Sequence, residues 1–177
     1  MNAADRKSLV VVMGATAVGK TTVGELLAKR LDVEYADADA FHPQANIDKM
    51  SNGVPLTDAD RWPWLEGIGQ WLAERAPIGG VVSCSALKRA YRDVLVNAAP
   101  TVSFLHLHGD PAVIRERIAN RKGHFMPPSM VDSQLATLEV LEPDEPGAVV
   151  DLTLTPDEIV DEFLATSVDP LGDRPTE

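Results

Sequence analysis

One short segment near the start of the chain constrains the rest: Gly14-Ala15-Thr16-Ala17-Val18-Gly19-Lys20-Thr21. Its spacing is that of a phosphate-binding loop, in which a glycine and four residues are followed by Gly-Lys-Thr. Glycines permit backbone angles that a Cβ would forbid, so that backbone N–H groups can close around a polyphosphate. Lys20 supplies a cation for the β- and γ-phosphates, and Thr21 supplies a hydroxyl for Mg²⁺. The segment therefore predicts a site for nucleotide phosphates.

The flanks of the loop have the character that such a site requires. Leu9–Met13 is a short apolar run rich in valine, which predicts a buried strand before the loop. Residues 22–31 place their leucines and Val23 on one face, which predicts a helix whose positive end points at the phosphates. The residues expected at the nucleotide are Gly14, Ala17, Val18, Gly19, Lys20, Thr21 and Thr22.

The composition of the chain narrows the classes of partner. A net charge of −11 over 177 residues argues against nucleic acid, because phosphate backbones need clustered lysine and arginine. Cys84 is the only cysteine, so an intrachain disulfide and a zinc site built on cysteines are excluded. No apolar run approaches the roughly 18 residues of a membrane span, and no signal peptide is recognised before the first strand. We expect a cytoplasmic protein without a membrane partner.

Predicted strands and helices alternate along the chain. Strands are expected at 9–13, 33–35, 80–84, 102–107 and 149–154. Helices are expected at 22–31, 46–51, from about 57, and at 88–97, 111–120, 129–141 and 155–165. This alternation predicts an α/β domain in which helices cover both faces of a parallel five-stranded sheet. We expect one domain over 1–177 with its core at about 9–165 and a loose tail at 167–177. Ligands of such sheets bind beyond the carboxyl ends of the strands.

Two acids, Asp37 and Asp39, stand at the end of the second predicted strand. One interpretation is a solvated turn. The other, favoured by the nearby phosphate loop, is a site for Mg²⁺ and for an attacking hydroxyl, both of which attract anionic oxygens. We assign Asp37 to Mg²⁺ through water and Asp39 to the substrate hydroxyl as general base.

Basic residues gather after the third predicted strand of this acidic chain. Lys88, Arg89 and Arg92 lie there, and Arg61 precedes them. Such a group suits an anionic acceptor, and a solvated surface helix is the alternative. Positive side chains at a helix start are unusual, because the helix dipole disfavours them there.

The segment 121–128 contains glycine and two prolines and has two possible roles. It is either an ordinary exposed connection or a small lid that excludes water from a phosphoryl transfer. Arg117 and Arg121 lie one helical turn apart and could reach nucleotide phosphates. His42 and His124 could donate hydrogen bonds to a polyol.

Together these segments resemble the gluconate kinase family of small P-loop kinases. The most specific pieces are His42-Pro43, with the residues before it, and Cys84-Ser85-Ala86-Leu87-Lys88. The segments that carry the resemblance, spread over about 9–165, are 37–43, 46–50, 53–61, 64–65, 84–88, 91–92 and 121–125. The chain departs from the expected pattern where Asp-Ala-Asp stands in place of Asp-Gly-Asp, and where 16–18 lack the expected serine and glycine.

The resemblance implies a three-layer P-loop kinase with a small lid that uses ATP and Mg²⁺ to phosphorylate D-gluconate at its 6-hydroxyl. It also implies a homodimer that feeds 6-phosphogluconate into sugar-acid catabolism. The catalytic residues that it implies are Lys20, Asp39 and Arg121, with Thr21 and Asp37 at the metal and Arg117 and Arg121 at the nucleotide. The implied gluconate contacts are Asp39, His42, Arg61, Lys88, Arg92 and His124.

Two other functions stay open at this point. A shikimate kinase shares the loop and the acid pair, but the glycine-rich segment expected after its third strand is replaced here by Cys84-Ser85-Ala86. A regulator that binds ATP without transferring phosphate would have no evident use for Asp39 or for the basic group.

Overall fold

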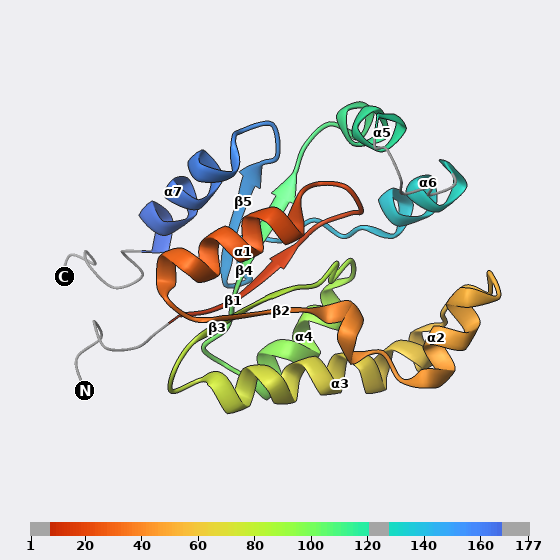
Figure 1. Cartoon of the computed structure of the whole chain (residues 1–177), viewed down its shortest axis with the longest axis horizontal. Coiled ribbons are helices and arrows are strands. Elements are labelled where there is room, and N and C mark those ends of the chain that lie inside the picture. The colour runs from red at the N-terminus through yellow and green to blue at the C-terminus, as the bar shows by residue number, and fades with distance from the viewer. Residues whose placement is uncertain (1–7, 121–127, 168–177) are drawn as a thin grey trace.

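A five-stranded sheet, entirely parallel, organises the computed structural model, which describes residues 8–120 and 128–167 (Figure 1). The strand order is β2-β3-β1-β4-β5. The strands are β1 (Leu9–Met13), β2 (Glu34–Asp37), β3 (Gly80–Ser83), β4 (Ser103–His108) and β5 (Gly147–Asp151). Val11 at the centre of β1 lies opposite Val82 on β3 and Phe104 on β4. The predicted parallel five-stranded sheet is confirmed.

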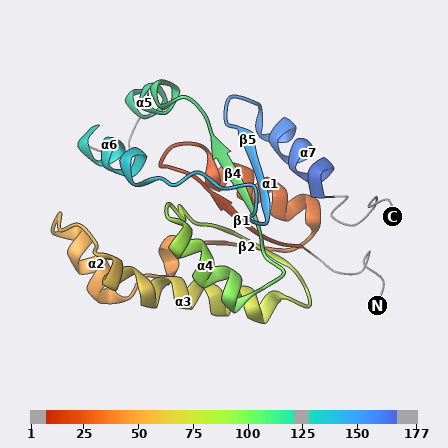
Figure 2. The same ribbon diagram turned by 180° about the vertical axis from the view of Figure 1, so that it is seen from behind.

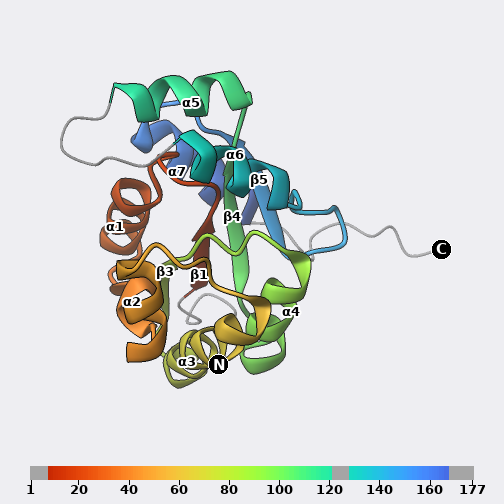
Figure 3. The ribbon, with the colours of Figure 1, turned by 90° about the vertical axis from the view of Figure 1, so that its right-hand side faces the viewer.

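Helices cover both faces of the sheet, as the alternation predicted. They are α1 (Lys20–Leu31), α2 (Gln44–Ser51), α3 (Asp58–Arg75), α4 (Arg89–Ala98), α5 (Pro111–Ala119), α6 (Pro128–Thr137) and α7 (Pro156–Ser167), with a short 3-10 helix, η2, at Ala38–Phe41. Helices α3 and α4 lie side by side on one face, seen from behind in Figure 2, and α1 and α7 lie on the other. Figure 3 shows α5 and α6 together at one end of the molecule. Within the described ranges no helix is both long and apolar enough to cross a membrane.

The alternation of side chains along β1 divides the core into two layers. Leu9, Val11 and Met13 pack against α3 and α4, whereas Val10 and Val12 pack against α1 and α7. All five are buried, because a central strand of a covered parallel sheet is enclosed on both faces. This rigid centre carries the phosphate loop directly at its carboxyl end.

Side-chain caps fix where three helices begin. The Thr57 hydroxyl and the Asp60 carboxylate form a reciprocal capping box at the start of α3, and Pro63 is accommodated inside that helix. Asp110 caps α5. Thr155 and Glu158 exchange the same pair of hydrogen bonds at the start of α7. These starts were predicted from the sequence.

Helix α6 ends at Thr137, four residues before the predicted end at 141. The Glu139 N–H donates to the Leu87 carbonyl at 2.7 Å, and the Leu141 N–H donates to His106 Nδ1 at 3.3 Å. Because these partners satisfy the backbone groups, the chain leaves the helix and docks beside α4. Of the predicted lid at 121–128 and the predicted tail at 167–177, residues 121–127 and 168–177 lie outside the described residues.

Candidate active site

The phosphate loop joins β1 to α1 through three residues with positive φ: Gly14 at 146°, Ala17 at 61° and Gly19 at 96°. A Cβ on Gly14 would lie 2.7 Å from the Leu107 carbonyl oxygen, so only glycine fits at that position. Ala17 holds a left-handed backbone at a penalty of roughly 1–2 kcal/mol. This curvature makes the cradle that a polyphosphate requires.

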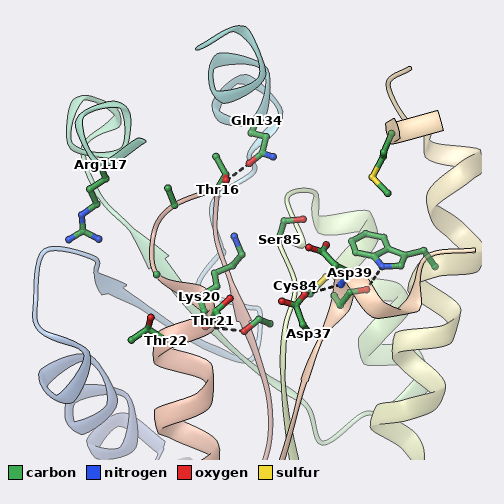
Figure 4. A pocket seen from close by; sticks show the side chains of 16 residues that line it. Thr16, Lys20, Thr21, Thr22, Asp37, Asp39, Cys84, Ser85, Arg117 and Gln134 are labelled. Atoms are coloured by element: carbon green, nitrogen blue, oxygen red, sulfur yellow. Dashed lines mark hydrogen bonds between the residues drawn. The ribbon is translucent and has the colours of Figure 1, made fainter. Parts of the chain in front are cut away.

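A cavity of about 720 Å³ lies beside the loop, where the carboxyl ends of β1, β2 and β3 meet (Figure 4). Its volume suits a small-molecule ligand. The lining residues are Thr16, Ala17, Gly19, Lys20, Thr21, Thr22, Asp37, Ala38, Asp39, Met50, Trp64, Ser83, Cys84, Ser85, Arg117 and Gln134. The cavity therefore brings together residues that the sequence analysis assigned separately to phosphate, metal and acceptor.

Lys20 lies at the first turn of α1 and bends over the loop. Its Nζ donates to the carbonyl oxygens of Gly14 and Ala15 at 3.1 and 2.8 Å. The Ser83 hydroxyl donates to the Lys20 carbonyl at 2.9 Å, which ties the first turn of α1 to the end of β3. The Tyr35 hydroxyl donates in turn to Ser83 Oγ at 3.0 Å. The lysine therefore stands on a fixed backbone beside the phosphate cradle.

Asp37 and Asp39 are exposed at the end of β2, and their positions are fixed by the turn between them. The Asp39 N–H donates to Asp37 Oδ1 at 2.9 Å, so that the Asp37 carboxylate caps η2. The buried indole N–H of Trp64 donates to the Ala38 carbonyl at 2.8 Å. Helix α3 thereby holds the turn that presents both carboxylates to the cavity.

The oxygens of Thr21 and Asp37 are the candidates for Mg²⁺. Among the residues that the structure describes, no three or more His, Cys, Asp or Glu side chains group as a metal site. Mg²⁺ in phosphoryl-transfer sites is held by one or two protein oxygens together with substrate phosphates and water. Two oxygen-bearing side chains beside a phosphate cradle fit that requirement.

Arg61 and Lys88 lie around Asp58 and Tyr91. Neither cation is among the described residues that line the cavity. Lys88 Nζ lies 3.2 Å from both Asp58 carboxylate oxygens, and Arg61 donates to the Tyr91 hydroxyl at 3.1 Å. The Tyr91 hydroxyl donates to Asp58. The hydrogen bonds from Tyr91 and Lys88 lower the pKa of Asp58, and Asp58 raises the pKa of Lys88. The two cations predicted to bind the acceptor are thus assembled in one group.

Arg92 corrects the sequence analysis, because it lies on the buried face of α4 and has no exposed surface. Its Nε and Nη2 donate to the Glu145 carboxylate at 2.7 and 2.9 Å, and its Nη1 donates to the Ala86 carbonyl at 2.8 Å. All of its guanidinium nitrogens are engaged, so Arg92 is withdrawn from the set of acceptor contacts. Arg89 lies outside the site too, bound to Glu142 and Asp144.

Of the remaining residues predicted to contact the nucleotide or the acceptor, some lie in the core, one lines the cavity and two lie outside the described residues. The His42 ring stacks on Trp64 at 4.5 Å between centroids, and burial lowers its pKa. The Val18 side chain is buried in the core, and Gly14 packs against Leu107. Arg117 lines the cavity and donates to the Leu152 carbonyl at 2.8 Å. Arg121 and His124 lie outside the described residues.

Cys84 lines the cavity but is almost fully buried, and this burial raises the pKa of its thiol to about 12. The thiol stays protonated at neutral pH, which excludes it as a nucleophile.

Sequence reasoning did not assign Gln134, Ser85 or Trp64 to the site, although Ser85 and Trp64 lie in segments that carry the family resemblance. All three line the cavity. A lone glutamine in a predicted helix has no distinguishing pattern, and the resemblance singled out the segment of Ser85 without giving this serine a role. A buried tryptophan needs a hydrogen-bond acceptor for its indole N–H, and this requirement was the one available signal that Trp64 contacts a polar group.

The parallel sheet, the phosphate loop at its central strand and the acids at the neighbouring strand define a P-loop kinase of small molecules. A family model described as an AAA domain matches residues 9–141.

The chain is 46% identical over 157 residues to a gluconokinase of Gluconobacter oxydans, covering 88% of each protein. It is 42% identical to the thermosensitive gluconokinase of Escherichia coli, covering 78% of this chain and 75% of the relative. The crystal structure of a gluconokinase from Sinorhizobium meliloti superposes with a TM-score of 0.82 at 48% identity, covering 90% of both chains. The chain therefore belongs to the gluconokinase family.

Proposed function

We propose that this protein transfers the γ-phosphate of ATP to the 6-hydroxyl of D-gluconate and forms 6-phospho-D-gluconate. The observation that carries the proposal is that Lys20 of the phosphate loop and the Asp39 carboxylate line one cavity. Family membership identifies the acceptor, because these relatives are gluconokinases.

In this reaction the gluconate hydroxyl oxygen forms the new bond to phosphorus, and the bond from phosphorus to ADP breaks. Asp39 accepts the proton of the attacking hydroxyl. The Lys20 ammonium leaves the loop carbonyls to neutralise charge on the β- and γ-phosphates. Thr21 and Asp37 would hold Mg²⁺, which supplies further neutralisation of phosphate charge when bound. Arg117, and Arg121 of the proposed lid, would border the nucleotide.

Arg61 and Lys88 are the candidates for the gluconate carboxylate, with His42 and His124 at its hydroxyls. Two cations can pair with a carboxylate by charge-assisted hydrogen bonds. Both now contact Asp58, so the incoming carboxylate would share or replace that acid as their partner.

The homodimer, the cytoplasmic location and the role in sugar-acid catabolism depend on the resemblance and remain predictions. Light scattering during size-exclusion chromatography would measure the oligomeric state.

An acceptor panel tests the proposed function. ADP release is measured with ATP and Mg²⁺ in the presence of gluconate, other aldonates, shikimate or no acceptor. We expect turnover of about 1–100 s⁻¹ with gluconate. Activity with shikimate alone would overturn the acceptor assignment. ATP binding without acceptor-dependent ADP release would instead identify a regulator.

A further inference from the structure

One side chain of α6 reaches back to the phosphate loop. The Thr16 N–H donates to the Gln134 side-chain oxygen Oε1 at 2.8 Å, across 118 positions of sequence (Figure 4). Gln134 is half-buried and lines the same cavity as Lys20 and Asp39. The contact connects α6 directly to the phosphate loop, and both residues line the cavity.

This hydrogen bond fixes the orientation of the Gln134 amide. A backbone N–H can only donate, so the accepting atom must be the amide oxygen. The attached NH₂ group then stands beside the loop with two donor hydrogens, and it has no hydrogen-bond partner among the described residues. Because Gln134 is only half-buried, this NH₂ group can exchange water for an acceptor oxygen on a ligand, and a terminal phosphate supplies one.

The chain that follows α6 is anchored on the opposite side of the site. The Glu139 N–H donates to the Leu87 carbonyl at 2.7 Å, in the loop after β3. Further on, the Glu145 carboxylate forms the buried pair with Arg92. The segment that carries Gln134 is therefore tied to the phosphate loop through Thr16 and to the loop after β3 through Leu87. Because the segment is fixed at both places, the side-chain NH₂ needs little reorganisation when the phosphate arrives.

We propose that Gln134 binds the terminal phosphate of ATP with its side-chain NH₂ while its oxygen holds the Thr16 N–H. The proposal rests on the proposed function only for the identity of ATP as the nucleotide. Gln134 would then distinguish ATP from ADP, which lacks the terminal phosphate.

The test compares Gln134→Glu with Gln134→Ala. The glutamate keeps an oxygen for Thr16 but replaces the NH₂ donor with a negative oxygen, whereas the alanine removes both groups. Calorimetry with Mg²⁺ measures the affinity for a non-hydrolysable ATP analogue and for ADP. We expect Gln134→Glu to weaken analogue binding by about 10- to 100-fold, and more than Gln134→Ala does, while ADP binding changes less than about threefold. Ser133→Ala, exposed on the same helix, is the matched control.

Equal losses of analogue and ADP affinity in Gln134→Glu would overturn the proposal, as would wild-type affinities for both. A defect in Gln134→Ala that is absent from Gln134→Glu would also overturn it, because the glutamine would then only hold the loop. No acceptor is present in these titrations. Failure of the wild-type protein to phosphorylate gluconate would therefore overturn the proposed function separately.

Discussion

At the scale of single residues, the chemistry depends on Lys20 and Asp39, which reach one cavity from different elements. Lys20 stands on α1 and Asp39 on η2, and each backbone is fixed by a contact from a neighbouring element. The Asp39 side chain itself is exposed, so it is available to a substrate. Catalysis of this kind is mainly positioning and charge neutralisation.

Asp39→Asn tests the role of general base. Asparagine keeps the shape and the backbone N–H that Asp37 accepts, but it cannot take up the proton of a hydroxyl. We expect kcat with gluconate to fall by about 10²- to 10⁴-fold, while the affinity for the ATP analogue changes less than about threefold. Steady-state kinetics and calorimetry measure the two quantities. An equal loss of ATP affinity would place Asp39 at the nucleotide instead.

At the scale of elements, the buried Arg92–Glu145 pair joins α4 to the segment before β5. Arg92 also holds the carbonyl of Ala86, whose φ of 45° lies in the left-handed region. The same loop places Ser85 at the cavity and Lys88 beside Asp58. The conformation of this loop therefore depends on Arg92. Burial alone would raise the pKa of Glu145, but the hydrogen bonds from Arg92 and from the Glu142 N–H outweigh it and lower that pKa.

Arg92→Met should lower the free energy of unfolding by about 3–5 kcal/mol, because it leaves the Glu145 carboxylate buried without its partner. Urea denaturation measures this change. The double variant Arg92→Met with Glu145→Leu should recover most of the loss. Arg89→Met, which removes only surface ion pairs, is the matched control and should cost about 0–1 kcal/mol. A loss no larger for Arg92→Met than for this control would contradict the account.

At the scale of the whole molecule, the parts that follow from local pattern were predictable. Neighbouring residues alone set the spacing of the phosphate loop, the alternation of strands and helices, and the capping boxes. These patterns predicted the sheet, the phosphate loop and the acids at the end of β2. The end of α6, the burial of Arg92 and the contact of Gln134 depend on residues far apart in sequence. The charge of Arg92 suggested an exposed contact, because nothing near it in sequence reveals Glu145 as its partner.

The buried His106 makes the stability of the whole fold depend on pH. It has no exposed surface, and burial, followed by the charges of His108 and Arg92, lowers its pKa from 6.5 to about 3. As the pH falls, His106 takes up a proton in the unfolded chain before it does so in the folded protein. The contribution of neutral His106 to the free energy of unfolding is therefore complete above about pH 6.5 and is lost as the pH falls toward 3. The slope attributable to His106 approaches about 1.4 kcal/mol for each pH unit.

Urea denaturation at several pH values between 5 and 6.5, directly below the ordinary histidine pKa of about 6.5, measures that slope. Carboxyls with a lowered pKa, such as Asp60 beside Lys49, lose their contribution only at lower pH, since their unfolded pKa is 3.8. His106→Gln should flatten the slope in this window, because the glutamine oxygen still accepts from the Leu141 N–H and does not titrate. An unchanged slope would assign the effect to other groups.

The most direct test of the central claim is the phosphorus NMR spectrum of the reaction product, recorded without proton decoupling. The protein is incubated with ATP, Mg²⁺ and D-gluconate, and Lys20→Met is the control that should form no product. Transfer to the primary 6-hydroxyl predicts a phosphate ester signal split by the two protons of that carbon into a triplet. A doublet would show transfer to a secondary hydroxyl, and inorganic phosphate alone would show hydrolysis; either result would contradict the proposed reaction.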